Sequence, residues 1–212
     1  TQSFYPPHHI TTGEGGAVST SNLKLKKIIE SFRDWGRDCW CASGEDDTCG
    51  KRFNWELGEL PKGYDHKYIY SHVGYNLKVT DMQAAIGIAQ MDKIHDFVKA
   101  RINNHEYLKK KLKKYDHFIT LPKKYEKAIP SWFGFLIKTK LKSPFKRNDL
   151  VFFLEKNNVA TRMLFAGNLT KQPAYLNQNH RVIGKLKNTN LLMDNAFWIG
   201  VYPGLTENKL EY

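Results

Sequence analysis

The sequence has 212 residues, of which 41% are hydrophobic and 13% aromatic, so it can bury a core in one large or two small domains. Its 33 Lys and Arg residues against 21 Asp and Glu give a net charge of +12, which favours an anionic partner such as a phosphate group. No nucleic-acid-binding signature, signal peptide or apolar run of about 20 residues accompanies this charge. We therefore expect a cytoplasmic protein that binds neither nucleic acid nor membranes.

The first seventy residues combine a short ordered start with a long irregular segment. Glycines within 13–16 predict a tight turn, and residues 17–20 predict a returning strand. Ser21 or Asn22 is placed to cap a helix that ends before Gly36. Residues 36–72 show no sustained periodicity and are rich in Gly, Asp, Cys and aromatic residues, which compact domains rarely tolerate without a functional cause.

Two helical patterns follow the irregular segment. Thr80 is placed to cap the first helix, and a second pattern continues through residues 97–112. The residues of the first helix that we expect to face inward are Met82, Ala85, Ile86 and Ala89.

The second half of the sequence has the pattern of a small α+β domain. Strand patterns cover residues 118–121, 132–137 and 159–163, and residues 148–155 predict a short helix. A further helix begins after residue 205, where the chain stops, and the chain starts without Met, so we interpret it as part of a longer protein. The predicted organisation is the end of a larger α/β domain over residues 1–95, followed by a small α+β domain over residues 96–212.

Three cysteines lie close together within the irregular segment. Cys39, Cys41 and Cys49 form a C-x-C-x7-C pattern, and in a reducing compartment such spacing favours metal binding over disulfides. By spacing alone zinc is the favoured metal, with His66 or His72 as a fourth ligand, and an iron–sulfur cluster also accepts three thiolates. Unligated thiols are the remaining alternative.

Two segments of the sequence resemble a known enzyme family. Residues 3–16, which run from Ser3 to a Gly-Glu-Gly-Gly turn, and residues 74–87, which begin Gly-Tyr-Asn, are similar to the DegT-type sugar aminotransferases and dehydratases. The resemblance implies the α/β fold of type I pyridoxal-phosphate aminotransferases. At the position where the family carries the lysine that binds the cofactor, this sequence has His8.

The replacement of lysine by histidine changes the chemistry that the site can perform. Imidazole cannot form the stable imine that a transaminase lysine forms, but His8 can act as a base, because the unperturbed histidine pKa lies near neutral pH. The resemblance therefore points to the dehydratase branch, which keeps its cofactor as pyridoxamine phosphate. By the same resemblance Ser3 binds the cofactor phosphate, Asn76 reaches a phosphate across a homodimer interface, and His9 gives structural support.

Other basic residues are substrate-binding candidates. Residues 161–173 form a Gly- and Asn-containing loop where the family places substrate contacts, and Arg162 and Lys171 in it are suited to a nucleotide diphosphate. Lys78 is a further candidate for binding the substrate, because it follows Asn76 by two residues. For all three, an ordinary solvent-exposed charge is the alternative.

The cysteine spacing resembles the 2Fe-2S site of the iron–sulfur branch of this family, whose fourth cysteine lies upstream of the histidine segment and thus outside this sequence. That branch removes the C-3 hydroxyl of CDP-linked 4-keto-6-deoxy sugars and receives electrons from an NADH-dependent flavin and iron–sulfur reductase. The implied product is a 3,6-dideoxyhexose for bacterial surface polysaccharide. The alternatives are a cluster-free sugar 3-dehydratase and a zinc-stabilised module without catalytic function.

Overall fold

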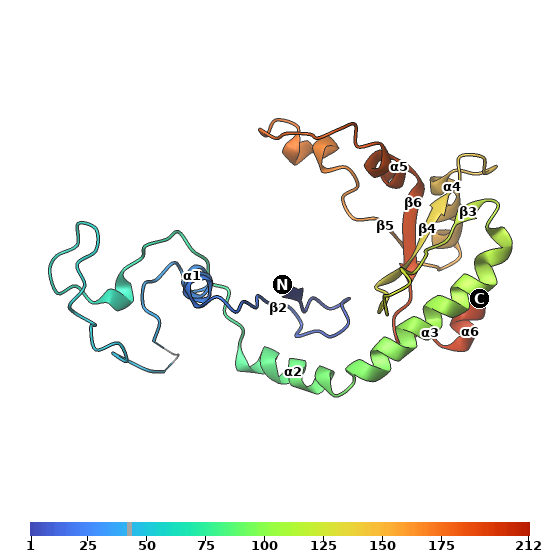
Figure 1. Ribbon diagram of the computed structural model, residues 1–212. Coiled ribbons are helices and arrows are strands. Elements are labelled where there is room, and N and C mark those ends of the chain that lie inside the picture. The colour runs from blue at the N-terminus through green and yellow to red at the C-terminus, as the bar shows by residue number, and fades with distance from the viewer. Residues whose placement is uncertain (42–43) are drawn as a thin grey trace. The chain divides into compact units, whose positions relative to one another are not determined.

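The computed structural model describes residues 1–41 and 44–212, which form two compact units, Thr1–Met91 and Asp92–Tyr212 (Figure 1). Each unit is considered by itself. No helix within the described residues is long and apolar enough to cross a membrane.

The first unit opens with a short β-hairpin and a helix. Strands β1 (Gln2–Ser3) and β2 (Gly16–Ala17) pair antiparallel, so the returning strand is shorter than the predicted 17–20. Helix α1 (Leu23–Arg33) follows, and the Asn22 side chain accepts hydrogen bonds from the backbone N–H groups of residues 24 and 25. Asn22 is therefore the cap, as one of the two sequence alternatives proposed.

Helix α2 (Asp81–Met91) begins at a reciprocal cap between Thr80 and Gln83. The start of this helix is as predicted, but the inward face is not: all four residues expected to be inward are exposed. The hairpin instead packs on the face that carries Gln83 and Gly87. The Gln83 side chain donates to the Glu14 carbonyl, and a Cβ at Gly87 would lie 3.1 Å from Thr12.

In the described residues between α1 and α2 the chain is irregular, as predicted, apart from the short 3-10 helix η1 (His66–Tyr68). The two ends of this segment meet at Gly36, whose carbonyl accepts hydrogen bonds from the backbone N–H groups of Ser71 and His72. A Cβ on Gly36 would lie 1.8 Å from the His72 carbonyl oxygen, and the glycine has a φ of +83°. Only glycine fits this position.

The second unit contains an antiparallel four-stranded sheet with the strand order β3-β4-β6-β5. Its strands are β3 (Ile119–Thr120), β4 (Gly134–Thr139), β5 (Thr161–Met163) and β6 (Ala196–Gly200). Its helices are α3 (Ile94–Leu112), α4 (Arg147–Lys156), α5 (Lys187–Asn195) and α6 (Glu207–Glu211), with 3-10 turns η2 (Lys113–Tyr115), η3 (Leu169–Lys171) and η4 (Pro173–Tyr175). Helix α5 and the central strand β6 were not predicted from the sequence.

The hydrophobic core of the second unit lies on one face of this sheet. Phe135 pairs with Ile199 and Ile137 with Phe197 in the β4–β6 register, so alternate residues of both strands face the same side. Phe135 and Phe197 are completely buried, and Val151 of α4 joins them. Helix and sheet therefore share one apolar layer.

Helix α3 carries a buried polar pair beside this core. His105 is completely buried and stacks on Trp132, with 3.9 Å between the ring centroids and 6° between the ring planes. One turn earlier, Arg101 is also buried and donates to the carbonyls of Trp132 and Phe133. Burial lowers the pKa of His105, and the opposing effect of Glu106 is smaller.

This burial predicts a specific acid sensitivity. Because the folded pKa of His105 lies below the ordinary value of 6.5, the unfolded chain binds the proton more readily. The stabilisation that the neutral His105 contributes is complete well above pH 6.5. It declines as the pH falls below this value, by up to about 1.4 kcal/mol per pH unit. We expect His105→Phe, which keeps a ring on Trp132, to have a flatter dependence of unfolding free energy on pH. Equal slopes for both proteins in chemical denaturation between pH 7.5 and 5 would contradict this expectation.

Candidate functional site

The β1–β2 hairpin holds the histidine segment in place. The backbone N–H of Phe4 donates to the Gly15 carbonyl at 2.8 Å, and that of Thr12 to the Phe4 carbonyl at 3.1 Å. The Thr12 hydroxyl, which is buried, donates to the Glu14 carbonyl within the glycine turn. Residues 5–11 therefore form a short loop whose two ends are both anchored.

Ser3 and His8, the predicted cofactor-binding and catalytic residues, lie together in this hairpin. His8 Nδ1 lies 3.0 Å from the Ser3 carbonyl oxygen, and the His8 backbone N–H donates to the Tyr5 carbonyl. A carbonyl oxygen only accepts, so Nδ1 carries the proton and Nε2 is the basic nitrogen. The Tyr5 and His8 rings meet edge to face, with 6.0 Å between their centroids. The fold thus fixes the orientation of the His8 ring through Nδ1.

Asn76 lies on a different segment of the first unit. It is exposed and forms an isolated antiparallel bridge with Asp34, just after helix α1. The neighbouring Tyr75 exchanges backbone hydrogen bonds with Phe32 and Trp35. The return of the chain past Gly36 therefore fixes the position of Asn76.

The three tentative substrate-binding residues have different surroundings. Lys78 Nζ is 2.9 Å from Asp34 Oδ1 and 3.8 Å from the Trp35 ring centroid, so its charge already has a partner. Arg162 on β5 and Lys171 in η3 belong to the second unit and are exposed. Arg162 donates to the carbonyl of its neighbour Thr161, and it stands opposite Trp198 in the sheet register.

The cysteine pattern folds into a loop of free thiols. Burial raises the pKa of Cys39, whereas a hydrogen bond from the Thr48 hydroxyl, 3.1 Å from the sulfur, lowers the pKa of Cys41. Cys39 and Cys41 also influence each other's pKa.

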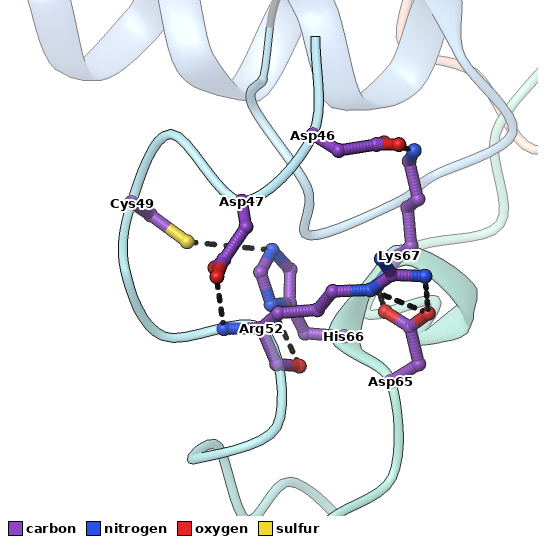
Figure 2. A network of polar contacts seen from close by, with 7 residues as sticks. All are labelled: Asp46, Asp47, Cys49, Arg52, Asp65, His66 and Lys67. Carbon is purple, nitrogen blue, oxygen red and sulfur yellow. Dashed lines mark hydrogen bonds and ion pairs between the residues drawn. The ribbon is translucent and has the colours of Figure 1, made fainter.

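Cys49 faces a histidine on the opposite side of the loop. Its Sγ atom lies 3.8 Å from Nε2 of His66, and Figure 2 shows this contact within a larger polar network. Arg52 and Asp65, which the sequence reasoning did not identify, form a close ion pair in that network. They occupy a segment without periodicity, so no sequence pattern marks them. His72, the other candidate for a fourth ligand, lies instead against Phe32 and Ser31.

The donor chemistry of this loop suits sulfur ligation of a metal, because three thiols without disulfides lie within a short stretch of sequence. The positions of the side chains, however, do not form such a site. Within residues 1–41 and 44–212, no three His, Cys, Asp or Glu side chains converge closely enough to hold a metal ion. The described residues therefore do not form a metal site by themselves.

With the histidine hairpin and the Gly-Tyr-Asn segment located, comparison with known proteins decides the family. The model of the DegT/DnrJ/EryC1/StrS aminotransferase family matches residues 1–212. The chain belongs to this family. Its members include pyridoxal-phosphate-dependent sugar aminotransferases and sugar 3-dehydratases.

Two curated relatives match the whole chain. It is 58% identical to the lipopolysaccharide biosynthesis protein RfbH of Salmonella typhimurium, of which it covers 48%. It is 51% identical to the dTDP-4-dehydro-2,6-dideoxy-D-glucose 3-dehydratase of Saccharopolyspora spinosa, of which it covers 46%. The chain therefore spans about half the length of these relatives, which act in lipopolysaccharide and dideoxysugar biosynthesis.

Solved structures confirm the predicted fold class. An E. coli GDP-4-keto-6-deoxy-D-mannose-3-dehydratase with bound hydrated PLP superposes with a TM-score of 0.78 at 24% identity, over 99% of this chain and 51% of that chain. A DegT-type aminotransferase from Brucella abortus gives a TM-score of 0.72 at 20% identity, over 99% and 47% of the two chains. Over the half that it spans, the chain has the α/β fold of these enzymes.

Proposed function

We propose that this protein is a cytoplasmic, pyridoxamine-phosphate-dependent 3-dehydrase of a CDP-linked 4-keto-6-deoxy sugar, which acts in 3,6-dideoxyhexose synthesis for lipopolysaccharide. The observation that carries the proposal is His8, which stands in the position of the cofactor lysine and has Nδ1 bonded to the Ser3 carbonyl. A family member without an amine at this position lacks the group that transamination needs, and keeps a group suited to general-base catalysis.

The residues of the hairpin fit the proposed cofactor. Pyridoxamine phosphate, when bound, supplies the amine that condenses with the sugar ketone and a ring that takes up electrons. Ser3 would hold its phosphate through the hydroxyl, and Asn76 would reach a phosphate through its amide. The Nε2 of His8 would accept the C4′ proton and would return it to the C-3 hydroxyl, which leaves as water. The Ser3 carbonyl keeps His8 in the tautomer that this proton transfer requires.

For the cysteine loop we propose a 2Fe-2S cluster whose fourth ligand is a residue outside this sequence. The support is the C-x-C-x7-C spacing and the contact of Cys39 with Cys41, together with the sulfur-only donor set. Dehydration alone does not complete the removal of an oxygen, which also needs two electrons. A cluster would pass these singly from an NADH-dependent flavin and iron–sulfur reductase.

A second candidate has one specific observation in its favour. The contact of His66 Nε2 with Cys49 is typical of a zinc site, which would make the loop a structural module in a cluster-free 3-dehydratase of the same family. The relative from E. coli O55:H7, a GDP-4-keto-6-deoxy-D-mannose 3-dehydratase, is 28% identical to the chain. Metal analysis separates the two candidates, because iron with sulfide supports the cluster and zinc supports the module.

The first test addresses His8 in the full-length protein. We expect His8→Asn to lower turnover of the CDP-linked sugar by about 10²- to 10⁴-fold, because Asn cannot accept the proton. Exchange of the C4′ proton of bound pyridoxamine phosphate with solvent should fall in parallel, while the cofactor still binds. His180→Asn is the matched control and should retain activity, because His180 is an exposed histidine whose Nδ1 also faces a backbone carbonyl. Sugars linked to dTDP and GDP test the choice of nucleotide. Near-normal exchange in His8→Asn would remove His8 as the base.

The second test addresses the proposed homodimer, in which Asn76 serves the partner's cofactor. His8→Asn and Asn76→Ala should each be inactive alone, but a mixed dimer has one site with both residues intact. Equal mixing with subunit exchange should therefore restore about a quarter of wild-type activity, since about half of the dimers are mixed. No recovery in a mixture shown by sedimentation to contain mixed dimers would place Asn76 in its own chain's site.

The third test addresses the cluster. We expect Cys41→Ser to abolish the visible iron–sulfur absorption and electron transfer while cofactor binding is unchanged, because the cysteine loop and the histidine hairpin are separate segments. Ser21→Ala, far from the loop in sequence and exposed, is a control. A normal iron content and spectrum in Cys41→Ser would exclude Cys41 from the ligands.

A further inference from the structure

The positive charge of the protein lies in its second unit. Residues 92–212 carry 23 of the 33 Lys and Arg residues and 10 of the 21 Asp and Glu residues, which gives this unit a net charge of +13. Residues 1–91 carry the remaining 10 basic and 11 acidic residues, a net charge of −1. The excess is largest between residues 109 and 147, where 13 basic residues accompany only Asp116 and Glu126. A segment with so much charge of one sign attracts anions.

A pocket of about 400 Å³ lies within the second unit, and most of its lining belongs to this basic segment. The residues that line it are His117, Lys138, Thr139, Lys140, Leu141, Lys142 and Leu191. Four of these carry a basic side chain, and none is acidic. The volume is in the range of small-molecule sites, and the lining suits an anion.

Strand β4 sets the position of Lys138. Its neighbours Ile137 and Thr139 are buried, so Lys138 projects from the opposite face of the sheet, where it is half-buried. The residues paired with it on the two adjoining strands are Thr120 and Ala196, which carry no charge. A charged residue on a strand gains from an opposite charge directly across from it. Lys138 therefore lacks the cross-strand partner that would neutralise it.

The turn that follows β4 brings Lys140 and Lys142 to the same pocket. The backbone N–H of Lys140 donates to the Phe118 carbonyl at 2.9 Å, and that of Ser143 donates to the Lys140 carbonyl at 3.0 Å. The His117 ring packs on the Phe118 ring, with 3.8 Å between their centroids. Because Phe118 in turn packs against the hydrophobic core, the turn and the histidine are both anchored to the unit.

The pocket lysines have no anionic partner in the part of the chain that the structure describes. None of its ion pairs includes Lys138, Lys140 or Lys142. The next acidic residue along the chain, Asp149, accepts a hydrogen bond from the backbone N–H of Lys146. Like charges that line one pocket repel each other, and a bound anion would offset this repulsion.

We propose that this pocket is a binding site for a small molecule that carries a diphosphate group. Two adjacent phosphates carry several negative charges and can meet all three ammonium groups, which only donate hydrogen bonds. Leu141, which is 83% exposed, and Leu191 offer apolar contacts to the rest of such a molecule. The site differs from the substrate-binding candidates, because Arg162 lies on β5, at the opposite edge of the sheet from β3 and its neighbour β4.

The test uses full-length protein without sugar, added cofactor or metal, so its result does not depend on the proposed function. Binding of inorganic diphosphate and of CDP is measured by calorimetry, and lysine acetylation followed by mass spectrometry locates the bound anion. The test variant is Lys140→Gln with Lys142→Gln, which are both exposed. The matched control is Lys123→Gln with Lys124→Gln, which removes the same charge from exposed positions outside the pocket.

We expect the test variant to bind diphosphate about 10-fold more weakly or worse, because hydrogen bonds to charged groups are worth at least about this factor. The control should bind nearly as wild type, since salt largely screens exposed charges outside the site. Diphosphate should slow acetylation of Lys138, Lys140 and Lys142 in wild type. Stronger protection by CDP than by inorganic diphosphate would assign the two leucines to an organic part, and equal protection would show that the diphosphate group suffices.

Three results would overturn the proposal. The first is that wild type binds neither probe, and the second is that both double variants lose affinity equally, as a diffuse effect of net charge would require. The third is protection spread over Lys109–Lys114 and Lys123 as strongly as over the pocket lysines, which would indicate a general polyanion surface. Thermal unfolding of each variant separates loss of binding from loss of fold, and the acetylation pattern of wild type tests the site without any substitution.

Discussion

The close approach of the chain to itself at Gly36 is the constraint on which the first unit depends. The Gly36 N–H donates to the Ser31 carbonyl at the end of α1, and its own carbonyl receives the N–H groups of Ser71 and His72. A Cβ at Gly74 would likewise lie 2.3 Å from the Gly36 nitrogen, so two glycine backbones are in contact. This closure turns residues 36–72 into a loop with fixed ends, and it sets Asn76 beside Asp34.

His8 and His66 are oriented by the same kind of hydrogen bond. In each the Nδ1 atom faces a backbone carbonyl, at 3.0 and 3.1 Å, so the proton is on Nδ1 and the lone pair on Nε2. His8 lies in a hairpin loop and is partly exposed, which suits the base that we propose it to be. His66 is buried and stacks on Trp55, with its Nε2 3.8 Å from Cys49 Sγ. His105 provides the contrast, since its ring is buried against Trp132 and this burial lowers its pKa.

Local signals in the sequence predicted local structure well. Asn22 and Thr80 cap helices because a short polar side chain can satisfy the first free N–H groups, a requirement visible within four residues of sequence. Strand β6 was missed because it follows α5 at once, without the turn residues that normally separate elements. The inward face of α2 was wrong because a hairpin distant in sequence packs on Gly87, and small residues carry no apolar signal.

The candidate site also combines residues that the sequence suggested with contacts between distant residues that it did not. His8 was proposed from the resemblance of its segment to the family and the three cysteines from their spacing, and the family membership supports the context in which His8 was interpreted. The contacts of His66 join residues 14 and 17 positions apart through a segment without periodicity, so spacing named it only as one of two candidates. Arg52 and Asp65 gave no signal at all, because an ion pair has no sequence pattern outside regular secondary structure.

The way in which the cysteine loop is held together bears on what a metal would do there. The second unit buries a cluster of apolar side chains on its sheet, whereas the described part of the loop buries Ile69 and His66 and otherwise depends on partly exposed ion pairs and backbone turns. Ion pairs of that kind contribute little net stability. Under the proposed function, ligation of Cys39, Cys41 and Cys49 would therefore add to the free energy that orders this loop, since metal binding and local folding are coupled.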